Sequence, residues 1–113
     1  MSESSVLTLE TETRGDSVIV RCGGKLTSDV SRQLHAEVKP LFASVRMVTL
    51  DLTDLTYMDS MGLGTIASLY VSAKTSGCRF ELINLSRRIR DLFTVTHLLS
   101  LFEACGEQNI TIP

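Results

Sequence analysis

The sequence has few of the residues on which several classes of functional site depend. Its three cysteines are odd in number and widely spaced, which favours neither a disulfide framework nor a zinc site, so we expect small buried thiols. Its two histidines, His35 and His97, have no evident partner for a metal or proton-transfer role. With 11 basic and 13 acidic residues the net charge is −2, so the basic face that nucleic-acid binding requires is missing.

Long apolar runs are also missing. No stretch approaches the ~20 apolar residues of a membrane-spanning helix, so we expect no direct membrane insertion. Residues 1–5 are polar, lack the apolar core of a signal peptide and are expected to be a flexible N-terminus, which favours a cytoplasmic protein. Residues 6–113 have the length and the composition of a single globular domain.

What is present is a pattern of alternating strands and helices. Arg14-Gly15-Asp16 predicts a hairpin turn between the first two strands. Thr27 or Ser28 would cap the first helix, and Pro40 limits how regular its last turn can be. The predicted elements are strands at 6–13, 17–22, 45–52 and 78–85 and helices at 29–42, at 60–76 and after Ser86. This order predicts an α/β domain with a mixed sheet.

The stretch Asp59 to Gly64 lies where a buried strand leads into an amphipathic helix. Asp59 is expected to be the N-cap of that helix, and Gly77 is expected to end it. Ser60 would then be exposed at the edge of the sheet beside unpaired helix N–H groups. The two glycines let another backbone approach closely or let the chain turn sharply. The buried stripe predicted for the helix includes Val71.

Two enzyme chemistries use such a turn, and the sequence supports neither. A phosphate-binding loop needs a lysine after its glycines, but no lysine occurs between Lys25 and Lys74. A nucleophile elbow needs a glycine two residues before the serine, where Met58 stands, and a histidine base. We therefore expect no enzyme activity, no cofactor and no metal site. The remaining interpretation of this turn is a serine that is itself chemically modified.

Residues 55–64 read Leu-Thr-Tyr-Met-Asp-Ser-Met-Gly-Leu-Gly. This stretch resembles the signature Asp-Ser-Ser-Gly-Leu-Gly of the anti-sigma factor antagonists, a family built on the STAS (sulfate transporter and anti-sigma antagonist) domain. Gly-Lys-Leu-Thr at 24–27 resembles the family's segment before its first helix, and 89–93 resembles its third helix. The resemblance covers roughly residues 6–102. Met61 departs from it, because the family has a second serine there.

The resemblance implies a STAS fold with four or five strands and about four helices. It also implies that Ser60 is phosphorylated by an anti-sigma factor that is a serine kinase and that binds ATP and Mg²⁺ in its own site. Unphosphorylated, the protein would sequester this partner; phosphorylated, it would release it. A separate serine phosphatase would reset Ser60.

The expected partner surface follows the first turns of the helix after Ser60. Small residues there permit close approach by a partner, although the same face would also suit packing on a neighbouring helix. The expected partner-binding residues are Thr27, Asp59, Ser60, Met61, Gly62, Gly64, Thr65 and Ser68. Arg87, Arg88 and Arg90 form a basic cluster that either pairs with acidic partner residues or is a solvated face.

Three alternatives stay open at this point. The first is a STAS scaffold or accessory subunit of a stress-sensing or transporter complex, without sigma-factor regulation. The second is a receiver-like domain phosphorylated on aspartate, suggested by Asp51, Asp54 and Asp59. The third is a nucleotide-binding module.

Overall fold

A computed structural model describes residues 7–95 of the chain. In chain order the elements are β1 (Leu7–Arg14), β2 (Ser17–Leu26), α1 (Ser28–Val38), the 3₁₀ helix η1 (Lys39–Ala43), β3 (Met47–Met58), α2 (Ser60–Ser76), β4 (Arg79–Ile83) and α3 (Arg87–Val95). The strands form one sheet in the order β1-β2-β3-β4. β1 pairs with β2 antiparallel, and β2–β3 and β3–β4 pair in parallel. The predicted α/β fold with an N-terminal hairpin and a mixed sheet is confirmed.

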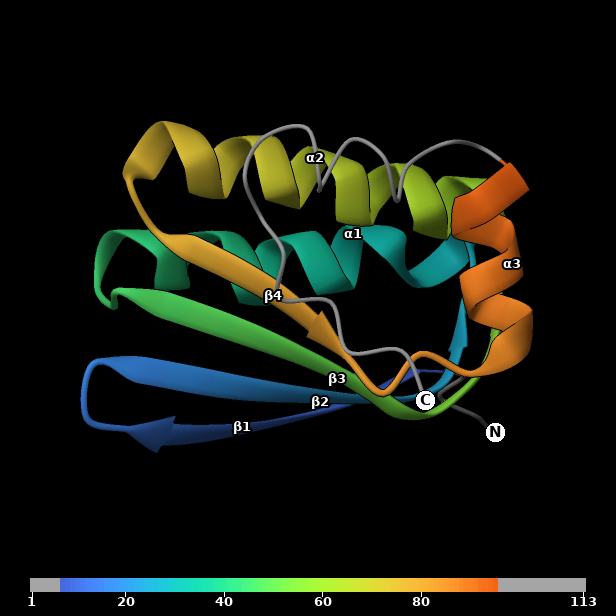
Figure 1. Ribbon diagram of the computed structural model, residues 1–113, viewed down its shortest axis with the longest axis horizontal. Helices are drawn as coiled ribbons and strands as arrows, with labels where there is room; N and C mark the ends of the chain where they lie inside the picture. Colours follow the sequence, from blue (N-terminus) through green and yellow to red (C-terminus); the bar gives the residue numbers. More distant parts are fainter. Residues whose placement is uncertain (1–6, 96–113) are drawn as a thin grey trace.

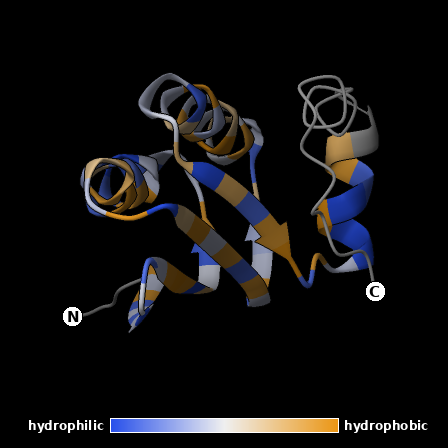
Figure 2. Ribbon diagram, turned by 60° about the vertical axis from the view of Figure 1, so that its left-hand side comes forward, coloured by the Kyte–Doolittle hydropathy of each residue, from blue (hydrophilic) through white to orange (hydrophobic). Residues whose placement is uncertain are grey.

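The two long helices lie side by side on one face of the sheet (Figure 1). This follows from the strand order, because β2, β3 and β4 succeed one another in one direction and right-handed crossovers then place both connecting helices on the same side. α3 stands apart from them, at the end of the sheet where β3 finishes (Figures 1 and 2). The end of β3 and the start of α2 therefore lie near three helices.

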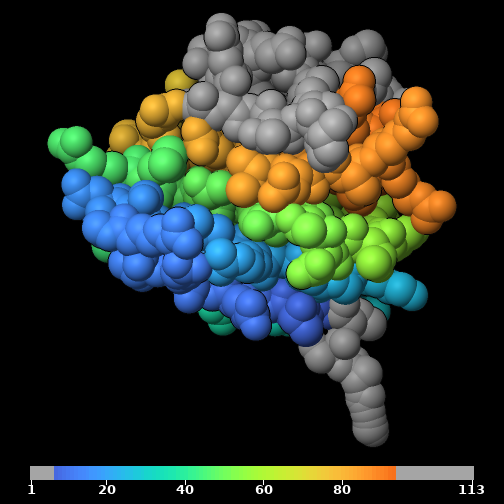
Figure 3. Space-filling model, turned by 60° about the horizontal axis from the view of Figure 1, so that its bottom comes forward, coloured from blue at the N-terminus to red at the C-terminus, as the bar shows by residue number. Residues whose placement is uncertain are grey.

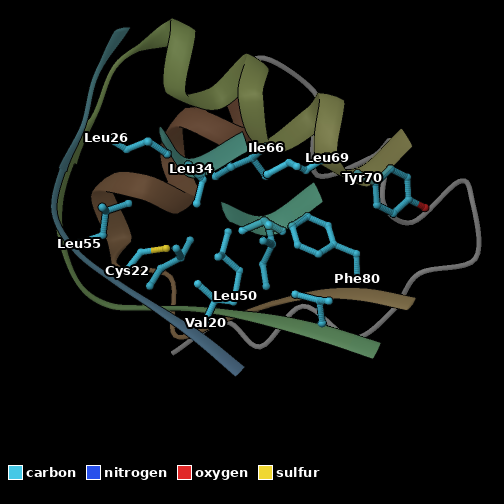
Figure 4. Close-up of a cluster of buried hydrophobic side chains, with 14 of the residues drawn as sticks. Val20, Cys22, Leu26, Leu34, Leu50, Leu55, Ile66, Leu69, Tyr70 and Phe80 are labelled. Atoms are coloured by element: carbon cyan, nitrogen blue, oxygen red, sulfur yellow. The ribbon is translucent and has the colours of Figure 1, made fainter. Parts of the chain in front are cut away.

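The core lies between the sheet and the pair α1–α2 (Figure 4). Side chains alternate along a regular strand, so every second residue of β2, of β4 and of the first half of β3 points toward the helices. The largest fully buried contributors include Leu50, Leu52, Ile66, Leu69, Tyr70 and Phe80. Cys22 and Cys78 are buried as predicted, and burial raises the pKa of Cys22 to about 12. That thiol stays neutral and unreactive at physiological pH.

Two strands are longer than predicted. β3 runs to Met58 and not only to Leu52, and β2 runs to Leu26 and not only to Cys22. The buried residues at the end of β3 are three apart, because its pairing with β2 shifts register twice and each shift places one extra residue in β3, so the simple alternation of a strand is lost there. The two longer strands therefore end directly before α1 and α2, so that the ends of both strands and the starts of both helices lie together.

The first helix is shorter than predicted. The helix expected at 29–42 is α-helical only to Val38 and continues as η1, because Pro40 offers no N–H for an α-helical hydrogen bond. In α2, Val71 is 56% exposed and does not belong to the buried stripe. Leu69 and Ala73 are buried in its place.

Some predictions fall on residues that the structure does not describe. These are the apolar segment 98–102, the possible strand 110–112, His97 and Cys105. In residues 7–95 the structure has three α-helices and four strands, so a fourth helix and a fifth strand remain predictions.

Candidate functional site

The site begins where β3 passes into α2 without an intervening loop. Met58 ends β3 in register with Leu26 at the end of β2, and the Asp59 backbone N–H donates to the Leu26 carbonyl at 3.2 Å. Asp59 keeps an extended backbone (φ −98°, ψ −179°), and Ser60 is the first residue of the helix. The turn therefore holds Ser60 at the carboxyl edge of the parallel strands, on rigid elements on both sides.

Asp59 connects the beginnings of two helices. Its Oδ1 accepts a hydrogen bond from the Gly62 backbone N–H at 2.9 Å, so the predicted N-cap of α2 is confirmed. Its Oδ2 accepts one from the Ser28 backbone N–H at 3.0 Å, in the first turn of α1. Thr27 occupies the N-cap position of α1 but makes no side-chain capping bond. A single carboxylate thus satisfies N–H groups at the positive ends of both helices.

The two glycines of the motif have opposite surroundings. Gly62 is buried, and a Cβ atom on it would lie 2.5 Å from the Leu26 carbonyl oxygen, so only glycine allows α2 to pack on the end of β2. Gly64 is exposed, and a Cβ atom on it would meet nothing within 4 Å. The packing of the described residues therefore requires Gly62 and leaves Gly64 unexplained.

A groove of about 430 Å³ runs between α1 and α2. Its walls are Ser28, Ser31, Arg32 and His35 from α1 and Met61, Gly64, Thr65 and Ser68 from α2. The small-residue face of α2 thus lines an open groove and is not covered by α1. Met61 is 59% exposed at its end, and the Thr65 hydroxyl donates to the Met61 carbonyl at 2.9 Å within its own helix.

A larger cavity of about 940 Å³ lies on the other side of the α2 start. It is lined by Tyr57, Met58, Asp59, Ser60, Arg87, Arg88, Asp91 and Leu92. Tyr57 is 43% exposed there. Ser60 is exposed, and its hydroxyl makes no hydrogen bond within the described part of the chain. Consecutive residues Ser60 and Met61 therefore line different hollows, one on each side of the helix start.

The structure brings most of the predicted partner-binding residues to one exposed area. Ser60, Met61, Gly64 and Ser68 are exposed, and Thr27, Asp59 and Thr65 are half-buried. Gly62 is buried and offers no surface, so we correct its role from partner contact to support of the fold.

Sequence reasoning missed the wall that α1 contributes. Arg32 and His35 follow Ser28 at helical spacing, which places all three on one face of α1. That periodicity was available from the sequence, but the position of this face beside α2 was not. Tyr57 was missed as well, because β3 was expected to end before it.

The receiver-like alternative is wrong. Such a fold begins with a parallel strand, whereas β1 and β2 form an antiparallel hairpin. Asp51 is engaged elsewhere: its Oδ1 accepts hydrogen bonds from the Thr53 backbone N–H at 3.0 Å and from Asn84 Nδ2 at 3.1 Å. Burial pushes the pKa of Asp51 upward, but hydrogen bonds from the Thr53 hydroxyl, the Thr53 backbone and Asn84, together with Arg21, outweigh it and hold the pKa below its usual range.

Within residues 7–95, no group of three or more His, Cys, Asp and Glu residues is placed to hold a metal ion. None of the described helices is long and apolar enough to cross a membrane.

Comparison with known proteins decides the family. Residues 8–110 match the family model of the STAS domain. The chain belongs to the STAS domain family. It is 28% identical over 88 residues to the anti-sigma-B factor antagonist of Bacillus subtilis, a match covering 78% of this chain and 81% of that protein.

Solved structures of STAS proteins are similar to this chain. An anti-sigma factor antagonist from Mycobacterium paratuberculosis superposes with a TM-score of 0.79 at 18% identity, covering 95% of this chain and 86% of the other. The Bacillus cell fate determinant SpoIIAA in its phosphorylated form superposes with a TM-score of 0.66 at 25% identity, covering 83% and 86%.

Proposed function

We propose that this STAS domain is a cytoplasmic anti-sigma factor antagonist, a binding module and not an enzyme, whose affinity for its partner is switched by phosphorylation of Ser60. The likeness to anti-sigma factor antagonists supports the class of partner. The observation that carries the switch is the placement of Ser60: an exposed hydroxyl without a hydrogen bond in the described residues, at the first position of α2 and beside the groove.

Phosphorylation at this position would leave the fold intact. A phosphate adds about −1.5 to −2 charges and three acceptor oxygens. At a helix N-terminus the macrodipole favours such an anion by ~0.3–1 kcal/mol. The neighbouring Asp59 carboxylate repels it, but that carboxylate is held by two backbone N–H groups. The net effect on folding is therefore expected to be small.

The same phosphate would oppose a partner seated on the groove. A partner surface that extends from the groove across the start of α2 would cover Ser60 as well and remove its phosphate from water. Unless the interface supplies a cation, burying that charge beside Asp59 costs several kcal/mol, which corresponds to a loss of about 10²- to 10³-fold in affinity. The interface is then lost while the fold survives, as a reversible binding switch requires.

The groove offers a partner mainly shape and a few polar groups. Gly64 and Ser68 let another backbone approach α2 closely, and Met61 supplies an exposed, flexible apolar side chain. We propose that Met61, where the family has a second serine, makes an apolar contact with the partner and leaves Ser60 as the acceptor of phosphate.

The proposed partner is an anti-sigma factor that acts as the serine kinase for Ser60 and holds ATP and Mg²⁺ in its own site. A separate serine phosphatase would restore the binding form. This chain would contribute the acceptor hydroxyl and the docking surface, and no cofactor.

The test incubates the purified protein with this kinase and ATP and locates the phosphate by mass spectrometry. The kinase is then titrated with wild type, Ser60→Ala, Ser60→Asp and Ser76→Asp; the last adds the same charge at the exposed far end of α2. We expect phosphate on Ser60, and at least tenfold weaker binding by Ser60→Asp alone. Phosphate elsewhere, or equal binding by all four proteins, would contradict the switch and favour a scaffold function.

A further inference from the structure

The cavity that Ser60 lines also contains two arginines of α3 in its lining. Arg87 and Arg88 form the first turn of α3 and line the same hollow of about 940 Å³ as Ser60. Figure 3 shows the orange atoms of α3 lying against the lime-green end of β3, which leads into Ser60. Segments nearly 30 residues apart in the sequence thus share one cavity.

The base of α3 is fixed, so these arginines project from a rigid element. Ser86 Oγ accepts a hydrogen bond from the Ile89 backbone N–H at 3.2 Å, which caps the helix. Ile89 and Phe93 are both fully buried and hold α3 against the rest of the domain. The two arginine side chains themselves are exposed.

The stability of α3 does not explain a pair of cations at this place. The positive end of a helix favours acidic residues in the first turn, yet the first turn of α3 contains none. Arg87 and Arg88 make no ion pair within the described residues, although Asp91 follows at helical spacing. Where a sequence breaks a local rule without a local gain, a functional reason is expected.

Among the described residues that line the cavity, two basic side chains are balanced by two acidic ones before a phosphate is added. Arg87 and Arg88 share this lining with two carboxylates, Asp59 and Asp91. Both oxygens of Asp59 accept backbone N–H bonds, so that carboxylate is already engaged. A dianion on Ser60 would leave the cavity with excess negative charge and two guanidinium groups available to bind it. Guanidinium groups match phosphate oxygens in geometry as well as in charge.

We propose that Arg87 and Arg88 form a clamp that holds the phosphate of phosphorylated Ser60 within the same chain. This inference rests on the proposed phosphorylation of Ser60 and adds a second consequence to it. The modification would tie α3 to the start of α2 and draw two surface cations toward the phosphate. The phosphorylated protein would then present a different surface charge pattern and shield its phosphate from the phosphatase.

The test installs phosphoserine at position 60 during synthesis, so that it does not depend on any kinase. The second pKa of the phosphate, about 6 when unperturbed, is measured by ³¹P NMR titration in wild type and in Arg87→Gln/Arg88→Gln. We expect it about 0.5–1 unit lower in wild type, a 3- to 10-fold difference in proton affinity, because the cations favour the dianion. Arg46→Gln removes an exposed cation at the opposite end of β3 and is expected to match wild type.

Asp91→Asn sharpens the test, since removing the competing carboxylate should lower the phosphate pKa further. Equal phosphate pKa values in wild type and the double variant would overturn the clamp. Binding of the anti-sigma factor by the same phosphorylated samples separates the two proposals. If wild type and double variant titrate alike but neither binds, the switch stands and only the clamp fails. If the clamp is seen but the phosphorylated protein still binds, the switch fails.

Discussion

Gly62 and Gly64 lie two positions apart on α2 and do opposite things. Gly62 faces inward, where the carbonyl of Leu26 leaves no room for a methyl group, and Gly64 faces outward, where nothing lies within 4 Å of the same group. A glycine inside a helix is unfavourable by roughly 0.5–1 kcal/mol relative to alanine. At Gly62 this cost allows close packing of α2 on β2, whereas at Gly64 the fold gains nothing in return. The inward side of the helix start serves the structure, and the outward side lines the groove that we propose as the partner site.

Asp59 contributes both to the fold and to the candidate site. Its carboxylate holds the first turns of α1 and α2 together, and it stands next to the serine that would be phosphorylated. The groove between those helices therefore has its geometry set by a residue of the motif itself. Variants on the two sides should separate effects on stability from effects on binding.

The largest effect on the fold is expected from Gly62→Ala. The new methyl group would force the start of α2 away from the backbone at Leu26, and such overpacking destabilises by ~1–3 kcal/mol. Urea unfolding measures the free energy of unfolding. Because helix propensity alone would favour alanine, an unchanged or higher stability would show that the close approach of Gly62 is not real.

Removal of the shared cap should have the next largest effect. Asp59→Ala leaves N–H groups of two helices without an acceptor, and loss of a cap typically costs ~0.5–2 kcal/mol. Asp59→Asn retains one acceptor oxygen and should cost about half as much. Thermal unfolding compares both with Asp54→Ala, which removes an exposed carboxylate of β3 that makes no hydrogen bond in the described region. If all three variants melt alike, Asp59 does not join the helices.

Gly64→Ala should change stability in the opposite direction to Gly62→Ala. With open space around the new methyl group, the variant should be more stable by ~0.5–1 kcal/mol. The same methyl group would project into the groove and weaken binding of the anti-sigma factor severalfold. Urea unfolding measures the stability and calorimetric titration measures the affinity of the same preparation, so the expected gain in stability and loss of affinity are tested together. Stabilisation without weaker binding would place the partner elsewhere on the molecule.

The smallest effect concerns Asp51, on the sheet and away from the motif. Its pKa is lowered in the folded protein, so it contributes stability that is present above the unfolded pKa of about 3.9 and is lost as the pH falls through the folded value. Wild type should exceed Asp51→Asn in stability at pH 7, and the difference should shrink below about pH 4. Binding of the partner should be unchanged. A stability difference between wild type and Asp51→Asn that grows as the pH falls would contradict the lowered pKa of Asp51.

The order of elements and the position of Ser60 could be predicted because they depend on local patterns. Asp59 is a short acceptor before an apolar helical stripe, and Gly77 ends that helix in a left-handed conformation. The end of β3 could not be predicted in the same way. Its buried residues there are spaced by three, since two register shifts against β2 each place an extra residue in β3, and a strand normally shows a period of two.

Features that depend on tertiary contacts could not be predicted from the sequence either. Nothing local distinguishes Gly62 from Gly64; the distinction arises from where the end of β2 lies. The second acceptor role of Asp59, toward Ser28, joins residues 31 positions apart. The presence of Arg87, Arg88 and Ser60 in the lining of one cavity likewise follows from the placement of α3 at the end of the sheet. These long-range juxtapositions form the candidate site.

The central claim is that phosphate on Ser60 acts on the interface and leaves the fold in place. The most direct measurement takes one sample with phosphoserine at position 60 and determines both its free energy of unfolding and its dissociation constant for the anti-sigma factor. We predict stability within about 1 kcal/mol of the unmodified protein, together with affinity reduced by about 10²-fold or more. Affinity retained, or lost in step with an equal loss of stability, would contradict the account.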